Sequence, residues 1–237
     1  MYFGDMSFFI YIIPPLLLAM YAQSKVKSTY GKYSKTMNMN GLTGADVARR
    51  ILERHGIDYV TVEPIEGILT DHYDPKARVL RLSSGVYGNK SLAAIGIAAH
   101  ECGHAIQDYD GYVFLKLRQT IVPVVNFANN AAMPLAFAGL MLGYFTGSGL
   151  GIGYYILQFA IIMFAAVLVF HLVTLPVELD ASSRALEILE GEGILDREEI
   201  IPAKKVLSAA ALTYIAAAAV AAGNLIRFIL LSRSSRR

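Results

Sequence analysis

Residues 93–107 read AAIGIAAHECGHAIQ, an apolar run with two histidines four positions apart and a glutamate directly after the first. Positions four apart share one face of an α-helix, so His100 and His104 can bind the same metal ion. Two neutral imidazoles with Glu101 as a neighbouring carboxylate are a common arrangement for activating water on zinc. Burying both histidines without a partner is costly, so a helix that carries them only for packing is the weaker interpretation. The stretch predicts a metal-binding helix.

The apolar character extends far beyond this helix. Hydrophobic residues make up 55% of the 237 positions and charged residues 17%, which is too apolar for an ordinary soluble domain. Four segments are almost free of charge, and a bilayer crossing takes about 20 such residues. The first lacks a basic leader and a clear cleavage site, which favours a retained anchor over a signal peptide. We expect four transmembrane helices, at residues 6–22, 121–145, 152–175 and 207–226.

Basic residues next to these spans predict the orientation of the chain. If all four spans cross, eight lysines and arginines lie on one side, which the positive-inside rule makes cytoplasmic. They are Lys25, Lys27, Lys32, Lys35, Lys116, Arg118, Lys204 and Lys205. Four arginines near the C-terminus, at 227, 233, 236 and 237, would fall on the other side, so the side of the tail stays open. We expect a multi-pass protein of the cell membrane whose active site faces the cytoplasm.

The polar stretch between the first two spans has the pattern of a small α+β domain. Thr43 with Asp46 is a capping pattern for a helix at 45–55, and residues 59–62 and 77–82 have the composition of strands. Strands followed by a metal-bearing helix resemble the upper half of a zincin, in which an edge strand can pair with extended peptide. The expected parts are an anchor at 1–22, a cytoplasmic zincin-like domain at 23–120, a transmembrane hairpin at 121–175, a third-ligand segment at 176–206, and a last span with a basic tail at 207–237.

A catalytic zinc site normally has three protein ligands, so one is still missing. Glu178 and Asp180 follow the third span, and only one can face the metal because positions two apart point in different directions on a helix. Arg184 can pair with Asp180 at the i+4 position, which leaves Glu178 as the better ligand. A solvated or capping acid at a helix start, which Pro176 suggests, is the competing interpretation.

Several motifs together resemble the YugP-like membrane zinc metallopeptidases. The resemblance covers nearly the whole chain and implies a zinc-dependent membrane peptidase of gluzincin type. It implies one Zn²⁺ held by His100, His104 and Glu178, with Glu101 as the general base for the attack of water on a peptide or protein substrate. The motifs are IAAHECGHAIQ at 97–107, LTDHYDP at 69–75, LRLSSGVY at 80–87, GLTGADVARRILERHGI at 41–57 and TLPVELDASSRA at 174–185.

A more distant likeness is to the HtpX and prenyl-protein-processing membrane metalloproteases. In those families an aspartate follows the ligand glutamate four positions on. Ser182 holds that place here, so whether Asp180 or Ser182 takes over its supporting role stays open. The donor that stabilises the oxyanion is also open, with His72, Tyr73 and His171 as candidates. A hydrogen-bonded turn for His72 and Tyr73, and a contact inside the helix bundle for His171, are the favoured alternatives.

Two other classes of function compete with a membrane zinc endopeptidase. A transport protein with a structural metal is disfavoured because Asp and Glu are absent from the predicted spans. A catalytically silent, peptidase-like scaffold is disfavoured because the His-Glu-x-x-His pattern is intact. The expected partners are a peptide or protein substrate, membrane proteins included, and the lipid bilayer; no nucleic acid is expected. Substrate identity, cleavage specificity and oligomeric state cannot be read from the sequence.

Overall fold

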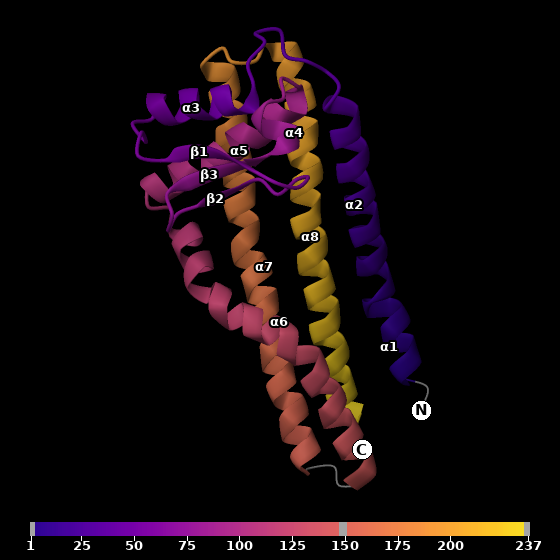
Figure 1. The fold of residues 1–237 in the computed structure, drawn as a ribbon. Coiled ribbons are helices and arrows are strands. Elements are labelled where there is room, and N and C mark those ends of the chain that lie inside the picture. Colours follow the sequence, from indigo (N-terminus) through magenta and orange to yellow (C-terminus); the bar gives the residue numbers. More distant parts are fainter. Residues whose placement is uncertain (1–2, 147–150, 235–237) are drawn as a thin grey trace. The chain divides into compact units, whose positions relative to one another are not determined.

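The computed structural model describes residues 3–146 and 151–234, and helices dominate it (Figure 1). Of the four arginines near the C-terminus, those at 236 and 237 lie outside these ranges. The long helices are α1 (Phe3–Tyr11), α2 (Ile13–Tyr33), α6 (Val113–Thr146), α7 (Ile152–Gly191) and α8 (Arg197–Ser234). The shorter elements, in chain order, are α3 (Gly44–Arg54), β1 (Thr61–Ile65), β2 (His72–Asp74), β3 (Val79–Ser83), α4 (Ser84–Tyr87) and α5 (Leu92–Tyr109).

Four helices of the described chain are long and apolar enough to cross a membrane, which confirms the four predicted spans. They are Met6–Tyr33, Val113–Phe145, Ile152–Gly191 and Arg197–Arg233. Several are longer than their apolar segments. The 40 residues of α7 extend over about 60 Å at 1.5 Å per residue, whereas the hydrocarbon core of a bilayer is about 30 Å thick. A continuous helix therefore begins in an apolar span and ends in a polar segment.

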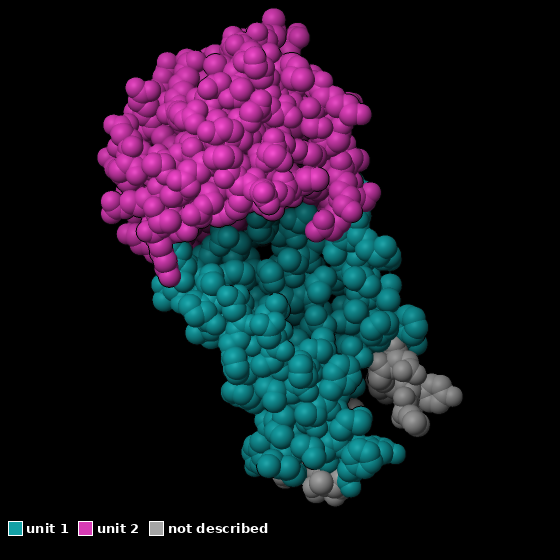
Figure 2. Space-filling view, in the orientation of Figure 1, with its two compact units in different colours: residues 1–21, 117–175, 213–237 teal, residues 22–116, 176–212 magenta. Residues whose placement is uncertain are grey.

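The chain forms two compact units, which Figure 2 distinguishes by colour. Unit 1 contains Met1–Tyr21, Leu117–Leu175 and Thr213–Arg237. Unit 2 contains Ala22–Lys116 and Pro176–Leu212. Unit 2 therefore combines the polar domain with the ends of α2 and α7 and the beginning of α8.

Unit 1 has a core of small and aromatic side chains from its long helices. Ala132 and Ala136 of α6 are buried against apolar residues of α7, and the rings of Phe164 and Phe228 stack with centroids 4.9 Å apart. A Cβ built on Gly139 would lie 2.7 Å from the backbone nitrogen of Leu157. Only glycine permits this approach of α6 to α7, and close backbone contact at small residues is typical of membrane helices.

Unit 2 is built on a three-stranded mixed sheet with strand order β1-β3-β2. β3 is parallel to β1, with Thr61 opposite Val79, and antiparallel to β2, with His72 opposite Arg81. Leu80 and Leu82 of the central strand are fully buried in the same core as residues of α3 and α5. β1 and β3 confirm the two predicted strands, with β1 shifted toward higher numbers. β2 includes His72 and Tyr73, where the sequence favours a hydrogen-bonded turn.

Local signals define the helices of this unit. The Thr43 side chain accepts a hydrogen bond from the backbone N–H of Asp46, and the Asp46 carboxylate accepts one from the N–H of Thr43. This capping box confirms the predicted start of α3, and it holds the pKa of Asp46 below its usual range. Gly56 has a φ of +68° just past the helix end, a conformation that glycine adopts without strain.

Candidate metal centre

The metal-binding motif lies on α5, in unit 2. Ser91 precedes the helix, and its hydroxyl accepts a hydrogen bond from the backbone N–H of Ala94 at 3.3 Å. This cap satisfies a backbone N–H of the first turn and sets the start of α5 at Ser91. Most of the helix is buried, and Cys102 points away from the histidines, with its thiol 3.6 Å from the carbonyl oxygen of Ala48 on α3. Burial raises the pKa of this thiol well above its usual value, so Cys102 is a packing residue.

Glu178 comes from the last part of α7, which packs against α5. The contact is very close at Gly103, where an added Cβ would lie 2.6 Å from the carbonyl oxygen of Ala181. The glycine inside the motif therefore allows the two helix backbones to approach each other. Pro176, expected at a helix start, lies inside α7 instead. The helix is thus continuous through Glu178 and carries the residue across from the two histidines.

Three side chains meet between these helices. The Nε2 atoms of His100 and His104 lie 3.3 and 3.6 Å from the same carboxylate oxygen of Glu178, Oε2. One possible ligand atom from each residue falls within a mutual distance of 4.8 Å. His104 and Glu178 are buried, and His100 is nearly so. The structure thus brings together the three residues expected as metal ligands.

The separations suit a zinc ion. Nitrogen and oxygen ligands lie about 2.0–2.2 Å from zinc, so two of them at a tetrahedral angle are about 3.4 Å apart. The two nitrogen-to-oxygen distances bracket this value. Two imidazoles and a carboxylate are also one of the donor sets of catalytic zinc sites. The residues therefore fit the metal by spacing and by chemistry.

Gln107 determines which nitrogen of His104 carries a proton. Its side-chain amide donates hydrogen bonds to the carbonyl oxygen of Val177 and to the Asp180 carboxylate, both at 2.8 Å. The amide oxygen of Gln107 therefore faces Nδ1 of His104, at 3.0 Å, and accepts its hydrogen. A neutral His104 then has its lone pair on Nε2, the atom directed at Glu178. Such support is typical of histidines that bind metals.

Ser182 plays the corresponding part for His100. Its hydroxyl oxygen lies 3.1 Å from Nδ1 of His100, one helical turn beyond Glu178. Asp180 reaches the other histidine through Gln107 and is paired at 2.7 Å with Arg184, which also contacts Asp110. Both candidates for the supporting role therefore reach the histidines: Ser182 contacts His100 directly, and Asp180 reaches His104 through Gln107.

Glu101 is also buried, with 8% of its surface exposed. Its carboxylate accepts no hydrogen bond or ion pair from the residues that the structure describes, so it is available to a water molecule or a substrate. Burial lowers the pKa of His104, but the hydrogen bond to Glu178 and the charges of Glu101 and Glu178 outweigh it and raise the pKa. The negative potential that these two carboxylates create at His104 also favours a cation there.

The candidate oxyanion donors have other partners or lie in the other unit. Nδ1 of His72 lies 2.8 Å from the carbonyl oxygen of Thr70, and Tyr73 donates to the Asp108 carboxylate at 3.0 Å. Both side chains are hydrogen-bonded, but the favoured turn is wrong here, because pairing with β3 places the two residues in strand β2. His171 belongs to unit 1, where it lines a cavity of about 240 Å³ with Asn129 and Asn224.

The sequence interpretation missed Gln107. It lies three positions after His104 and is fully buried. The available signal was the helical spacing, because a polar side chain at i+3 from a ligand histidine shares its face.

The chain is similar to known proteins over nearly its whole length. The model of a family described as "Putative neutral zinc metallopeptidase" matches residues 8–233. The chain is 48% identical over 231 residues to a protein of Bacillus subtilis (strain 168) named "Putative membrane protease YugP", covering 98% of this chain and 99% of that protein. No solved structure matches the chain.

Proposed function

Because the chain belongs to the family "Putative neutral zinc metallopeptidase", we propose that it is a multi-pass membrane endopeptidase that uses one zinc ion. The ligands in this proposal are His100, His104 and Glu178. The observation that carries it is the meeting of two imidazole nitrogens and one carboxylate oxygen at a single buried point. We also propose that the site faces the cytoplasm at the cell membrane, which is supported by the eight basic residues beside the spans.

The residues have separate roles in the proposed hydrolysis. When bound, zinc would supply Lewis acidity, lowering the pKa of water toward about 7 and polarising the scissile carbonyl. Glu101 takes a proton from the attacking water and later transfers it to the leaving amine. Overall, one peptide bond and one water molecule give a carboxylic acid and an amine. Ser182 and Gln107 fix the orientation of the two imidazole rings. The site is buried, which strengthens these electrostatic interactions.

We propose further that unit 2 is a zincin-like catalytic domain of the gluzincin type. The supporting features are the mixed sheet, the α5 helix with both histidines, and a third ligand on a separate helix. β1 and β2 are the edges of the sheet. An edge strand offers unpaired backbone groups to an extended substrate, which suits a peptidase that cleaves within a chain.

The test uses the full-length protein in detergent, with zinc content and casein cleavage measured for the wild type and for Glu101→Gln. We expect about one zinc per chain in both, and a loss of cleavage of at least about 100-fold in the variant because general-base catalysis typically contributes that much. A wild type without zinc, or a variant that cleaves as fast as the wild type, would contradict the proposal. A wild type that binds zinc but does not cleave would favour the silent scaffold.

A further inference from the structure

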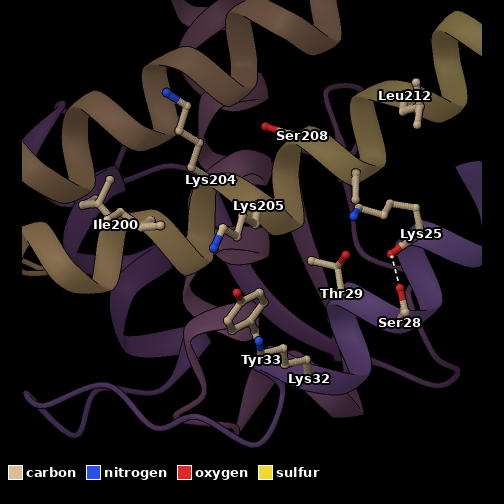
Figure 3. A pocket seen from close by; sticks show the side chains of 12 residues that line it. Lys25, Ser28, Thr29, Lys32, Tyr33, Ile200, Lys204, Lys205, Ser208 and Leu212 are labelled. Carbon is tan, nitrogen blue, oxygen red and sulfur yellow. Dashed lines mark hydrogen bonds between the residues drawn. The ribbon is translucent and has the colours of Figure 1, made fainter.

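A basic pocket lies in unit 2, apart from the metal centre. It has a volume of about 910 Å³ and is lined by the last turns of α2 and the first part of α8 (Figure 3). Pockets for small molecules commonly have volumes of about 300–1,000 Å³, so this one is large enough for a polar headgroup. No residue of the metal centre lines it.

The charges in the pocket have one sign. Four lysines line it, and no Asp or Glu is among the described residues that do so. None of the four ammonium groups forms an ion pair with the part of the chain that the structure describes, although Lys32 lies 5.4 Å from the centre of the Tyr33 ring. Because like charges repel, such a cluster is stabilised by an anion. The lysines are Lys25, Lys32, Lys204 and Lys205.

Helical spacing places hydroxyl groups on the same helix faces as the lysines. Lys25, Thr29 and Lys32 follow one face of α2, at i, i+4 and i+7, and Lys204 and Ser208 follow one face of α8. Hydroxyls of Thr29, Tyr33 and Ser208 therefore line the pocket together with the lysines, while the Ser28 hydroxyl donates to the carbonyl oxygen of Lys25 at 3.1 Å (Figure 3). Ammonium groups with hydroxyl donors are the usual partners of phosphate oxygens.

The position of the lysines along the two helices indicates which kind of phosphate compound the pocket would bind. On α2 they follow the charge-free run that ends at residue 22, and on α8 they precede the one that begins at residue 207. Both helices are candidate membrane spans, so both place lysines where an apolar span meets its polar end. Lipid headgroups lie at this level, and apolar Ile201 and Leu212 also line the pocket.

We propose that this pocket binds the phosphate headgroup of an anionic phospholipid. The four lysines contact the phosphate, the neighbouring hydroxyls donate hydrogen bonds to it, and the apolar lining accommodates the beginning of the acyl chains. Basic pockets between transmembrane helices recognise anionic headgroups by this chemistry.

The test measures lipid binding to the full-length protein by native mass spectrometry in neutral detergent. Phosphatidylglycerol and phosphatidylcholine are titrated separately, and the ratio of their dissociation constants is compared among variants. Lys25→Gln with Lys32→Gln changes one wall of the pocket, and Lys204→Gln with Lys205→Gln changes the other. The matched control is Lys27→Gln with Lys35→Gln, which removes the same charge from the same segment outside the pocket.

We expect the wild type to prefer phosphatidylglycerol and each pocket variant to lose about fivefold of that preference per lysine removed. The control should keep it, and excess inorganic phosphate or a soluble phosphopeptide should not displace the lipid. All these lysines are exposed, so the variants should fold. Folding is checked by the buried thiol of Cys102, which should stay unreactive toward a thiol reagent in each variant. An equal loss in the control and the pocket variants, no loss in either pocket variant, or displacement by phosphate or phosphopeptide would overturn the proposal.

Discussion

Ser182 and Gln107 hold the two histidines of the metal centre by the ring nitrogens that face away from Glu178. A hydrogen-bond acceptor at Nδ1 fixes the tautomer and the ring orientation, so that Nε2 is presented to the metal with its lone pair. The Gln107 and Ser182 side chains differ in how firmly their own orientation is fixed. Gln107 has two further acceptors that lock its amide, whereas the Ser182 hydroxyl can rotate.

Replacing Ser182 with alanine should weaken zinc binding by about 10- to 100-fold, since the loss of such supporting groups typically has this effect. Zinc affinity is measured by competition with a chromophoric chelator. Ser183→Ala is the matched control, because the Ser183 hydroxyl bonds to Glu187 at 3.0 Å and not to a histidine. Equal affinities in the two variants would show that the Ser182 contact does not support the metal.

At the scale of elements, the centre depends on how closely α5 and α7 approach each other. Gly103 faces the backbone of Ala181, between the two histidines on one helix and next to Glu178 on the other. The other glycine of α5, Gly96, faces Ala203 of α8 with an ordinary contact of 3.4 Å for an added Cβ. The same helix therefore offers one glycine that the site requires and one that it does not.

Gly103→Ala should separate the two helices, destabilise the protein by about 1–3 kcal/mol as overpacked cores do, and abolish zinc binding at stoichiometric zinc. Gly96→Ala should bind zinc as the wild type does and gain helix propensity, up to about 1 kcal/mol. Thermal unfolding and zinc content of both purified variants test this. The expectation is wrong if both glycines tolerate alanine equally.

Much of the element structure could be predicted from local signals. The Thr43–Asp46 capping box and the Ser91 cap mark helix starts by the chemistry of single side chains, and the apolar segments indicate the four spans. β2 was missed because its three residues have no strand pattern and owe their conformation to pairing with β3. The Gly103 contact and the Gln107 hydrogen bonds depend on α7, which is distant in sequence.

At the scale of the whole molecule, unit 2 is assembled from segments that lie on either side of a pair of spans. The histidines come from residues 22–116, and Glu178 comes from residues 176–212. The sequence predicts the two histidines by motif, and Glu178 by spacing together with the family resemblance, but it could not show that the ends of the long helices belong to the same compact unit as the sheet.

A fragment of residues 23–120 should therefore bind zinc much more weakly than the full chain and cleave no casein, because it lacks the third ligand and the wall formed by α7. Zinc titration of the two proteins under the same conditions gives the comparison. Affinity equal to that of the full-length protein would show that α5 binds the metal without Glu178.

The central claim is that one zinc ion is bound by two imidazoles and a carboxylate from separate helices. X-ray absorption at the zinc edge of the full-length protein tests it most directly. The account predicts two imidazole nitrogens with oxygen as the remaining ligand type, at about 2.0–2.2 Å from the metal. A sulfur ligand, a third imidazole, or only one imidazole in the spectrum would contradict it.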